Sequence, residues 1–207
     1  MNTTQYHLAE LAIARDPSRP EHVAPPGLPP GHRVLDVCCG AVQTLITAYP
    51  DRLSVGLDID LPALQLGRTL TDRVLFTCGR AEALPYRTAS FDAVIARVSL
   101  PLTNLPMSLR EIHRVLRKGG LLWMALHPWS HCLKQARQGG LKRWVYFSYV
   151  ALNSALLAVF QRVVPWPGRG YESFQTEGGI SRILRKIGYT EISITRTRHF
   201  VVTAVRS

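Results

Sequence analysis

The chain has 207 residues and is 46% hydrophobic, so it is long enough to bury one substantial core and is close to the size of a single α/β domain. Its formal net charge is +11, and residues 128–207 account for most of it, because they hold 12 Lys and Arg against 3 Asp and Glu. This asymmetry is typical either of an anionic partner (a membrane surface, a nucleic acid or an acidic substrate) or of an Arg-rich surface that only serves solubility.

The cysteines and the first residues argue against several classes of protein. The four cysteines include the adjacent pair Cys38 and Cys39 but no C-x-x-C pair, so they predict neither a metal site nor a disulfide framework. We expect reduced thiols. Residues 1–16 contain charged side chains and no long apolar run, which is unlike a secretory signal. We therefore expect a cytoplasmic protein.

Short apolar runs alternate with helical periodicity through most of the chain. The predicted elements, in chain order, are a helix at 6–14, a Pro-rich linker at 25–30, a strand at 33–38, a helix at 42–49, a strand at 53–58, a helix at 61–70, strands at 74–77 and 91–96, a helix through 109–116 that ends at Gly119-Gly120, and a strand at 121–126. Strands that alternate with helices predict a parallel sheet with helices on both faces.

Residues 128–175 depart from this rhythm and contain all but one of the tryptophans. The alternation resumes with a helix near 179–187 and two β-rich runs, 191–195 and 200–205, whose short connection predicts an antiparallel hairpin at one edge of the sheet. We therefore expect one domain over residues 1–207. It should be a doubly wound, mostly parallel seven-stranded sheet with a helical insertion, residues 128–175, after the fifth strand.

The loop after the first predicted strand carries the main functional signal. Residues 34–41 read Val-Leu-Asp-Val-Cys-Cys-Gly-Ala, and Asp58 ends the second strand. In open α/β sheets, ligands bind beyond the carboxyl ends of the strands, where an acidic residue can accept hydrogen bonds from both ribose hydroxyls of a nucleoside. A dinucleotide would require G-x-G-x-x-G, whereas this loop offers only Gly40.

An acid at the end of the first strand, followed by a cysteine and one glycine, resembles the cofactor loop of class I S-adenosylmethionine-dependent methyltransferases. Four further segments resemble that family in order, and a weaker match follows at 180–189. They are Asp58-Ile59-Asp60 at the end of strand two, Gly79 to Tyr86 as the adenine segment, Ser90 to Val94 at the start of strand four, and Leu109 to Gly120 before strand five. The resemblance implies a Rossmann-like fold, S-adenosylmethionine as cofactor, S-adenosylhomocysteine as product, and methyl transfer.

The resemblance also implies roles for individual residues. The loop from Asp36 to Gly40 would cradle the methionine part of the cofactor, Asp58 would bind the ribose, the backbone amide of Ala81 would meet the adenine, and Arg97 with Val98 would line the site. The full set of predicted cofactor-binding residues is Asp36, Cys38, Cys39, Gly40, Ala41, Asp58, Ile59, Ala81, Glu82, Arg97 and Val98.

Three residues depart from the family pattern. Cys38 and Val42 stand where the family usually has glycine, and Arg80 stands where it usually has aspartate. A β-branched residue resists positive φ and adds bulk where helix and strand approach, unless the helix simply begins at Val42. Arginine has only donors, so Arg80 cannot accept a hydrogen bond from the adenine amino group. The alternative hypothesis is therefore a methyltransferase-like binding or scaffold protein without turnover.

Methyl transfer from a sulfonium is an in-line displacement that depends mainly on alignment. Positioning contributes roughly 7–11 kcal/mol, whereas a general base contributes about 10²–10⁴-fold. The candidate base is His127, at the end of strand five, with His131 and Tyr171 behind it. Although His127 and His131 are four residues apart, Pro128 and the lack of a third ligand argue against a metal site. We expect no metal.

The insertion gives the clue to the acceptor. Residues 144–160 carry no charge, and Lys142-Arg143 and Arg162 flank them. Three interpretations remain open: a lid helix over the active site, an interfacial helix on anionic lipid, or an oligomer contact. The first two favour a small, apolar or lipid-like acceptor, and RNA is disfavoured because the aromatic residues are not interleaved with Arg and Lys. The predicted substrate-binding residues are Tyr6, His131, Trp144 and Tyr171.

Overall fold

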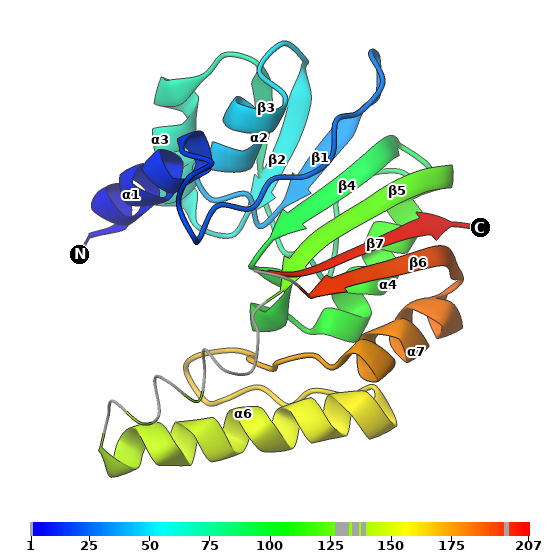
Figure 1. The fold of residues 1–207 in the computed structure, drawn as a ribbon. Helices are drawn as coiled ribbons and strands as arrows, with labels where there is room; N and C mark the ends of the chain where they lie inside the picture. The colour runs from blue at the N-terminus through cyan, green and yellow to red at the C-terminus, as the bar shows by residue number, and fades with distance from the viewer. Residues whose placement is uncertain (1, 127–132, 134–136, 138–139, 197–198) are drawn as a thin grey trace.

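The computed structural model describes residues 2–126, 133, 137, 140–196 and 199–207. Its centre is a seven-stranded sheet with the order β3-β2-β1-β4-β5-β7-β6 (Figure 1). The strands are β1 (Val34–Val37), β2 (Ser54–Asp58), β3 (Val74–Cys78), β4 (Phe91–Arg97), β5 (Leu116–Leu126), β6 (Tyr189–Arg196) and β7 (Phe200–Arg206). Strands β1 to β5 pair in parallel, and β7 runs antiparallel to both β5 and β6. The predicted sheet and its antiparallel hairpin are confirmed.

Helices cover both faces of this sheet. They are α1 (Thr3–Arg15), α2 (Gln43–Ala48), α3 (Leu61–Leu70), the 3-10 helix η1 (Leu100–Leu102), α4 (Leu105–Val115), α6 (Leu141–Phe160) and α7 (Glu177–Ile187). Side-chain caps begin several of them: Asn2 forms a capping box with Gln5 before α1, and Thr176 accepts from the amide of Gly179 before α7. Gly188 ends α7 in the left-handed conformation that glycine adopts without steric cost.

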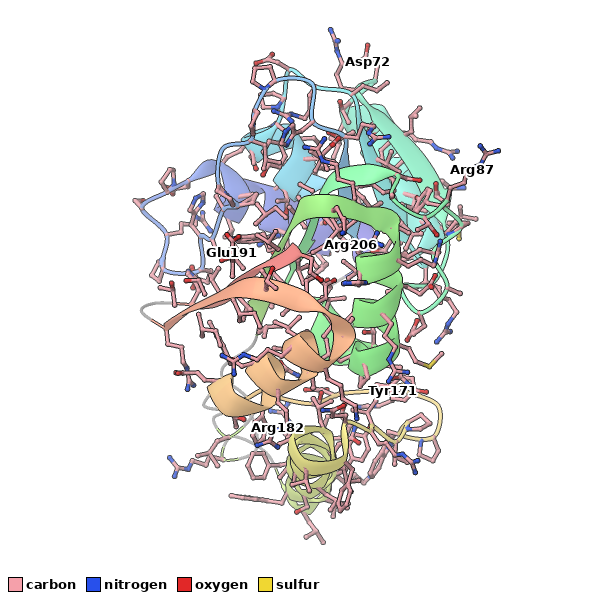
Figure 2. All side chains as sticks on the ribbon, turned by 90° about the vertical axis from the view of Figure 1, so that its right-hand side faces the viewer. Asp72, Arg87, Tyr171, Arg182, Glu191 and Arg206 are labelled. Atoms are coloured by element: carbon pink, nitrogen blue, oxygen red, sulfur yellow. The ribbon has the colours of Figure 1, made fainter. Side chains whose placement is uncertain are left out.

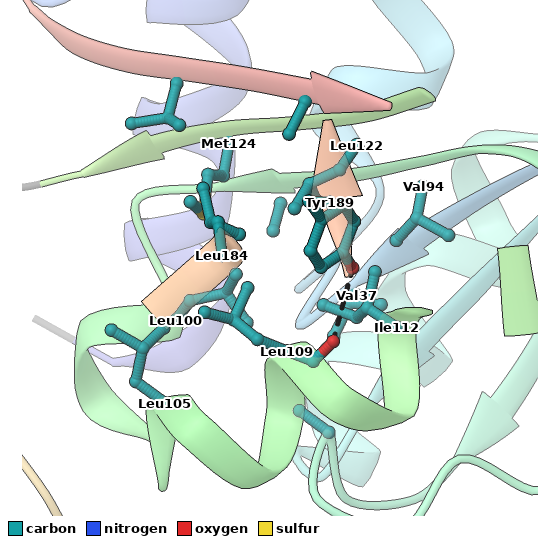
Figure 3. Packing of buried hydrophobic residues seen from close by; sticks show 14 of the residues in the cluster. Val37, Val94, Leu100, Leu105, Leu109, Ile112, Leu122, Met124, Leu184 and Tyr189 are labelled. Atoms are coloured by element: carbon teal, nitrogen blue, oxygen red, sulfur yellow. Dashed lines mark hydrogen bonds between the residues drawn. The ribbon is translucent and has the colours of Figure 1, made fainter. Parts of the chain in front are cut away.

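The core consists of two clusters, one on each face of the sheet. The larger contains the inward faces of α4 and α7 with β4, β5 and β7, and Figure 3 shows its packing around Leu109 and Tyr189. There the Tyr189 hydroxyl donates to the Leu109 carbonyl at 3.2 Å, which satisfies a polar group inside an apolar environment. The smaller cluster joins α2 and α3 to the opposite face through Val42, Leu45 and Leu64.

The boundary between α4 and β5 differs from the prediction. The helix ends at Val115 and the strand already begins at Leu116, so Gly119 and Gly120 lie inside β5 and do not end the helix. Gly119 has φ 70°, and a Cβ on Gly120 would lie 2.8 Å from the Arg117 carbonyl oxygen. The glycines therefore allow an irregular start of the strand, where its register against β4 also shifts.

The insertion contains α6, which packs against α7 and lies along one end of the molecule (Figures 1 and 2). Residues 161–176 return from the end of α6 to the start of α7 and hydrogen-bond to the helix along the way. Among the described helices, α6 is the one that is long and apolar enough to cross a membrane.

Candidate functional site

The carboxyl ends of β1, β2 and β4 meet at one edge of the sheet, because the three strands are parallel neighbours. Asp58, the last residue of β2, accepts hydrogen bonds there from two backbone amides. Its Oδ2 accepts from Gly40 at 2.7 Å and its Oδ1 accepts from Asp60 at 2.8 Å. The carboxylate is thus fixed between the loop after β1 and the start of α3, and each oxygen keeps a further lone pair for a ligand.

The loop after β1 contains three left-handed residues. Cys38, Gly40 and Val42 have φ values of 57°, 54° and 58°. Cys38 and Val42 are therefore strained at the two positions where a glycine was expected, and helix α2 begins only at Gln43, so the helix does not relieve Val42. Burial raises the pKa of the Cys38 thiol to about 12 and that of Cys39 as well, so both remain protonated thiols.

Glycines on neighbouring elements make room for the Val42 side chain. Val42 is fully buried. A Cβ on Gly56 of β2 would lie 2.9 Å from Val42 Cγ1 and 2.8 Å from Cys39 Sγ, and a Cβ on Gly67 of α3 would lie 3.4 Å from Val42 Cγ2. The bulk at position 42 is thus balanced by missing side chains on β2 and α3, so Val42 contributes to the core.

Replacing Val42 with glycine tests this balance. The change removes left-handed strain of about 1–2 kcal/mol. It also removes an apolar side chain whose burial contributes about 1.5–3 kcal/mol, and it leaves a cavity. We therefore expect Val42→Gly to lower the free energy of unfolding by about 1–2 kcal/mol, measured by urea denaturation. A more stable variant would show that strain outweighs packing here; as a control, Gly56→Ala should destabilise the wild type more than the Val42→Gly background.

Asp36 of β1 is buried at the same edge. It is 1% exposed, and its Oδ2 makes no hydrogen bond within the part of the chain that the structure describes. Burial raises the pKa of this carboxyl to about 8. The positive charge of Arg97 opposes this rise, and the negative charge of Asp58 adds to it. A buried carboxyl with an unpaired oxygen is costly unless it serves a ligand, and a cationic ligand is the one that would stabilise its ionised form.

Helix α1 lies over this edge. The buried His7 packs on the loop, since a Cβ on Gly40 would lie 2.7 Å from His7 Cε1, and Gln43 Nε2 donates to the His7 carbonyl at 3.2 Å. Glu10 forms an ion pair with Arg97 at 2.8 Å. The helix therefore ties the loop after β1 to the segment after β4. Sequence reasoning missed His7, Glu10 and Gln43, because no motif signals contacts across 36 and 87 residues.

The predicted adenine segment is held by helix α4. Ala81 is buried at 3% exposure, and Glu82 accepts from the amide of Asn104 at 2.9 Å, at the start of α4. Arg80 extends to Glu82, with 3.5 Å between its Nε and the carboxylate. Glu82 therefore supports the segment through its side chain and also pairs with Arg80.

A second set of contacts fixes the end of this segment. Arg114 of α4 donates to the carbonyls of Tyr86 at 2.7 Å and Leu84 at 2.9 Å, and Glu111 accepts from the Leu84 amide at 2.9 Å. These two residues belong to the stretch that resembles the family before strand five. Their role here is to position the loop between β3 and β4.

The other predicted site residues are distributed over two regions. Val98 (φ 61°) directly follows β4, and the exposed Ile59 directly follows Asp58, so both lie at the strand edge. Tyr6 lies on α1. Burial and the negative charge of Glu10 raise the pKa of its hydroxyl, and the positive charge of Arg97 partly offsets this rise. Trp144 and Tyr171 lie instead at the α6 end of the molecule, where Figure 2 labels Tyr171. His127 and His131 lie outside the described residues.

A cavity of about 660 Å³ opens between the first half of α6 and residues 166–172. Aromatic, aliphatic and charged side chains line it: Tyr146, Phe147, Trp166, Leu141, Val145, Val150, Lys142, Arg143, Arg169 and Glu172. The Trp166 ring lies edge-on to Tyr146 with centroids 5.6 Å apart, and the Tyr146 hydroxyl donates to the Glu172 carboxylate. Such a lining buries flat apolar groups well and offers a few polar groups to orient them.

Comparison with known proteins yields a family model and homologous enzymes. Residues 35–124 match the model of a methyltransferase domain. A demethylmenaquinone methyltransferase of Roseiflexus castenholzii is 30% identical over 172 residues, which cover 78% of this chain and 69% of the relative. A 2-phytyl-1,4-naphtoquinone methyltransferase of Thermosynechococcus vestitus is 27% identical over 175 residues, which cover 80% of this chain and 75% of the relative. The structure of an S-adenosylmethionine-dependent methyltransferase from Methanosarcina mazei has a TM-score of 0.58 at 19% identity and covers 86% of this chain and 94% of that one.

Proposed function

Because the chain belongs to the class I S-adenosylmethionine-dependent methyltransferase family, we propose that it methylates a small, apolar or lipid-like acceptor such as a quinone. The enzyme uses S-adenosylmethionine as cofactor and releases S-adenosylhomocysteine. The observation that carries the acceptor class is the aromatic lining of the cavity beside α6. The names of the two quinone-methylating relatives support the same class.

The residues at the strand edge fit the cofactor. Asp58 would accept from the ribose hydroxyls with its remaining lone pairs, and the unpaired Oδ2 of Asp36 would face the positive charge of the methionine part. The backbone amide of Ala81 would meet the adenine, with Ile59 against its ring. When bound, the cofactor supplies a methyl group on a cationic sulfonium, which leaves by in-line displacement.

The protein's own contribution is then alignment and exclusion of water. Helix α1 closes the edge through the Glu10 to Arg97 ion pair and the packing of His7 on Gly40. In this proposal, residues 141–172 form the wall of the acceptor site, and His127 is the residue that would take a proton from the acceptor. Positioning of this kind contributes roughly 7–11 kcal/mol, more than a single base does.

An acceptor panel tests the proposal. Three naphthoquinol acceptors, with a long prenyl tail, a short prenyl tail and no tail, are compared with a polar catechol, and methylated product is measured by mass spectrometry. We expect kcat/KM to rise with tail length and to be lowest for the catechol. Methylation of the catechol alone would overturn the proposed acceptor class while leaving the methyltransferase family intact.

A pair of aromatic variants locates the acceptor site. Trp166→Ala opens the cavity wall and is expected to raise the KM of the short-tailed acceptor several-fold while leaving that of S-adenosylmethionine within about twofold. Phe160→Ala is the matched control, because Phe160 is 67% exposed at the far end of α6 and does not line the cavity. Equal effects of the two changes would place the acceptor elsewhere.

A further inference from the structure

Helix α6 presents an apolar face to solvent. Leu141, Val145, Leu152 and Val159 follow one another at spacings of four, seven and seven residues, which puts them on one side of the helix. They are 80%, 51%, 61% and 63% exposed. Trp144, at 43% exposure, extends the same face. A surface helix of a soluble protein normally turns such a stripe toward the core, so this face indicates a partner.

Two polar residues of α6, Asn153 and Ser154, face the opposite way, into the protein. Asn153 is 1% exposed, and its Nδ2 donates to the Glu172 carbonyl at 2.9 Å while its Oδ1 accepts from the Val164 amide at 2.7 Å. Ser154, at 6% exposure, accepts from the Phe174 amide at 2.9 Å. Asn153 and Ser154 are therefore used to hold residues 161–176. The third polar residue of the run, Ser148, lies seven residues after Leu141 on the exposed side, where its hydroxyl donates to the Trp144 carbonyl at 3.0 Å.

Basic residues flank the outer face at both of its ends. Lys142 and Arg143 lie in the first turn of α6. At the other end, Arg162 and Phe160 line one pocket, and Arg182 of α7 donates to the Ala158 carbonyl at 2.8 Å. Residues 140–187 contain seven Lys and Arg but only two Glu. An apolar stripe bordered by cations matches a surface that is apolar inside and anionic at its boundary.

We propose that α6 lies flat in the interface of an anionic lipid bilayer, with its outer face in the acyl region and its inner face on the protein. Trp144, near one end of the face, belongs to the residue type that is enriched at such interfaces. On the proposed function, the bilayer would then also be the source from which an apolar acceptor reaches the enzyme. The docking itself rests on α6 and does not depend on the identity of the acceptor.

The inner face distinguishes this arrangement from a membrane span. A spanning α6 would have to separate from residues 161–176, which would break the three hydrogen bonds of Asn153 and that of Ser154 and expose both polar groups to hydrocarbon. In the flat arrangement all of these bonds are kept. The structure of the enzyme is then the same in water and on the membrane.

The charges distinguish it from a dimer contact. In a two-fold pairing of α6 with its copy, parallel helices would bring like ends together, and antiparallel helices would bring Lys142 and Arg143 against Arg162 and Arg182. Cations meet cations in both cases, which opposes association. An anionic bilayer attracts both ends at once.

Vesicle sedimentation of the full chain tests the proposal without acceptor or cofactor. The vesicles contain either phosphatidylcholine alone or phosphatidylcholine with 30% phosphatidylglycerol, at 50 and 500 mM NaCl. We expect most of the protein to sediment with the anionic vesicles at low salt, and binding to be at least tenfold weaker on neutral vesicles or at high salt. Protein that stays in the supernatant with anionic vesicles at low salt overturns the proposal.

Matched variants locate the contact on α6. Leu152→Glu places a negative charge in the middle of the outer face and is expected to weaken vesicle binding at least tenfold, with unchanged thermal stability and S-adenosylhomocysteine affinity. Leu53→Glu is the control, because Leu53 is 62% exposed just before β2 and should bind as the wild type does. Equal binding by Leu152→Glu and the wild type removes α6 from the contact. Sedimentation velocity without vesicles completes the set: a wild-type dimer that Leu152→Glu dissociates would assign the face to a second copy of the chain.

Discussion

Asp58→Ala is expected to weaken the binding of S-adenosylmethionine at least 100-fold, because the two charge-assisted hydrogen bonds to a ribose contribute about 1.5–3 kcal/mol each. Asp58 ends β2 between the loop after β1 and the start of α3, and two backbone amides fix its carboxylate. Equilibrium dialysis with radiolabelled cofactor measures the loss directly.

The control for this change is the next acid along the chain. Asp60 accepts only a long hydrogen bond from the Ala63 amide, at 3.4 Å, as the N-cap of α3. Asp60→Ala should therefore lower stability by about 0.5–2 kcal/mol and leave cofactor affinity within a few-fold. Asp58→Asn, which keeps one oxygen for the Gly40 amide, separates loss of the ligand contact from loss of the loop. If both Asp58 variants bind as the wild type does, Asp58 is not part of the cofactor site.

The second large effect concerns the pH dependence that Asp36 imposes. Burial raises the pKa of its carboxyl from the ordinary 3.8 to about 8 in the folded protein. Between these two pH values the unfolded chain has lost this proton while the folded chain keeps it, so the contribution of Asp36 to stability falls as the pH rises. Urea denaturation from pH 5 to pH 8 is expected to show this fall, and Asp36→Asn is expected to flatten it. A wild type and variant with the same pH profile would contradict the expectation.

The same carboxyl predicts how cofactor binding depends on pH. A cationic sulfonium and ammonium beside Asp36 stabilise its ionised form, so binding releases a proton wherever the free protein holds Asp36 neutral. Affinity for S-adenosylmethionine should therefore rise from pH 6 to pH 8 and level off above the folded pKa. Asp36→Asn should bind more weakly and lose this slope. Calorimetry in two buffers of different ionisation enthalpy counts the released proton independently.

The sheet could be predicted because its signal is local. Apolar runs of four to seven residues, most of them separated by helical periods, define β1 to β5 and the final hairpin without any knowledge of contacts. The prediction failed at Gly119 and Gly120. A pair of glycines ends a helix in many proteins, whereas here the helix ends earlier because Leu116 pairs with Phe91, a contact that periodicity does not reveal.

The site could be predicted only where it follows the strands. Asp36, Gly40 and Asp58 meet because their strands are neighbours, and the sequence motifs carry that information. The covering helix α1 shows no motif, since His7 and Glu10 are defined as site residues only by tertiary contacts. Val42 shows both what the sequence can predict and what only tertiary contacts reveal. Its misfit with the family could be read from the sequence, whereas its accommodation depends on glycines from two other elements.

The orientation of α6 could not be predicted for a similar reason. In the sequence, Ser148, Asn153 and Ser154 break the apolar run and leave no clean face. In the structure these residues have different partners. Ser148 donates to the Trp144 carbonyl within the helix, whereas Asn153 and Ser154 hydrogen-bond to residues 164–174. The partners of Asn153 and Ser154 lie 11 to 20 residues further along the chain, outside any helical window.

Titration calorimetry of the wild type with S-adenosylhomocysteine addresses the central conclusion, that the strained loop after β1 and the two acids beside it hold the cofactor of a working methyltransferase. Saturable binding to one site per chain, with an affinity that Asp58→Ala abolishes or weakens at least 100-fold, is the expected result. No detectable heat with millimolar ligand, in a protein that unfolds cooperatively, would contradict it and would leave a methyltransferase fold that serves only as a scaffold.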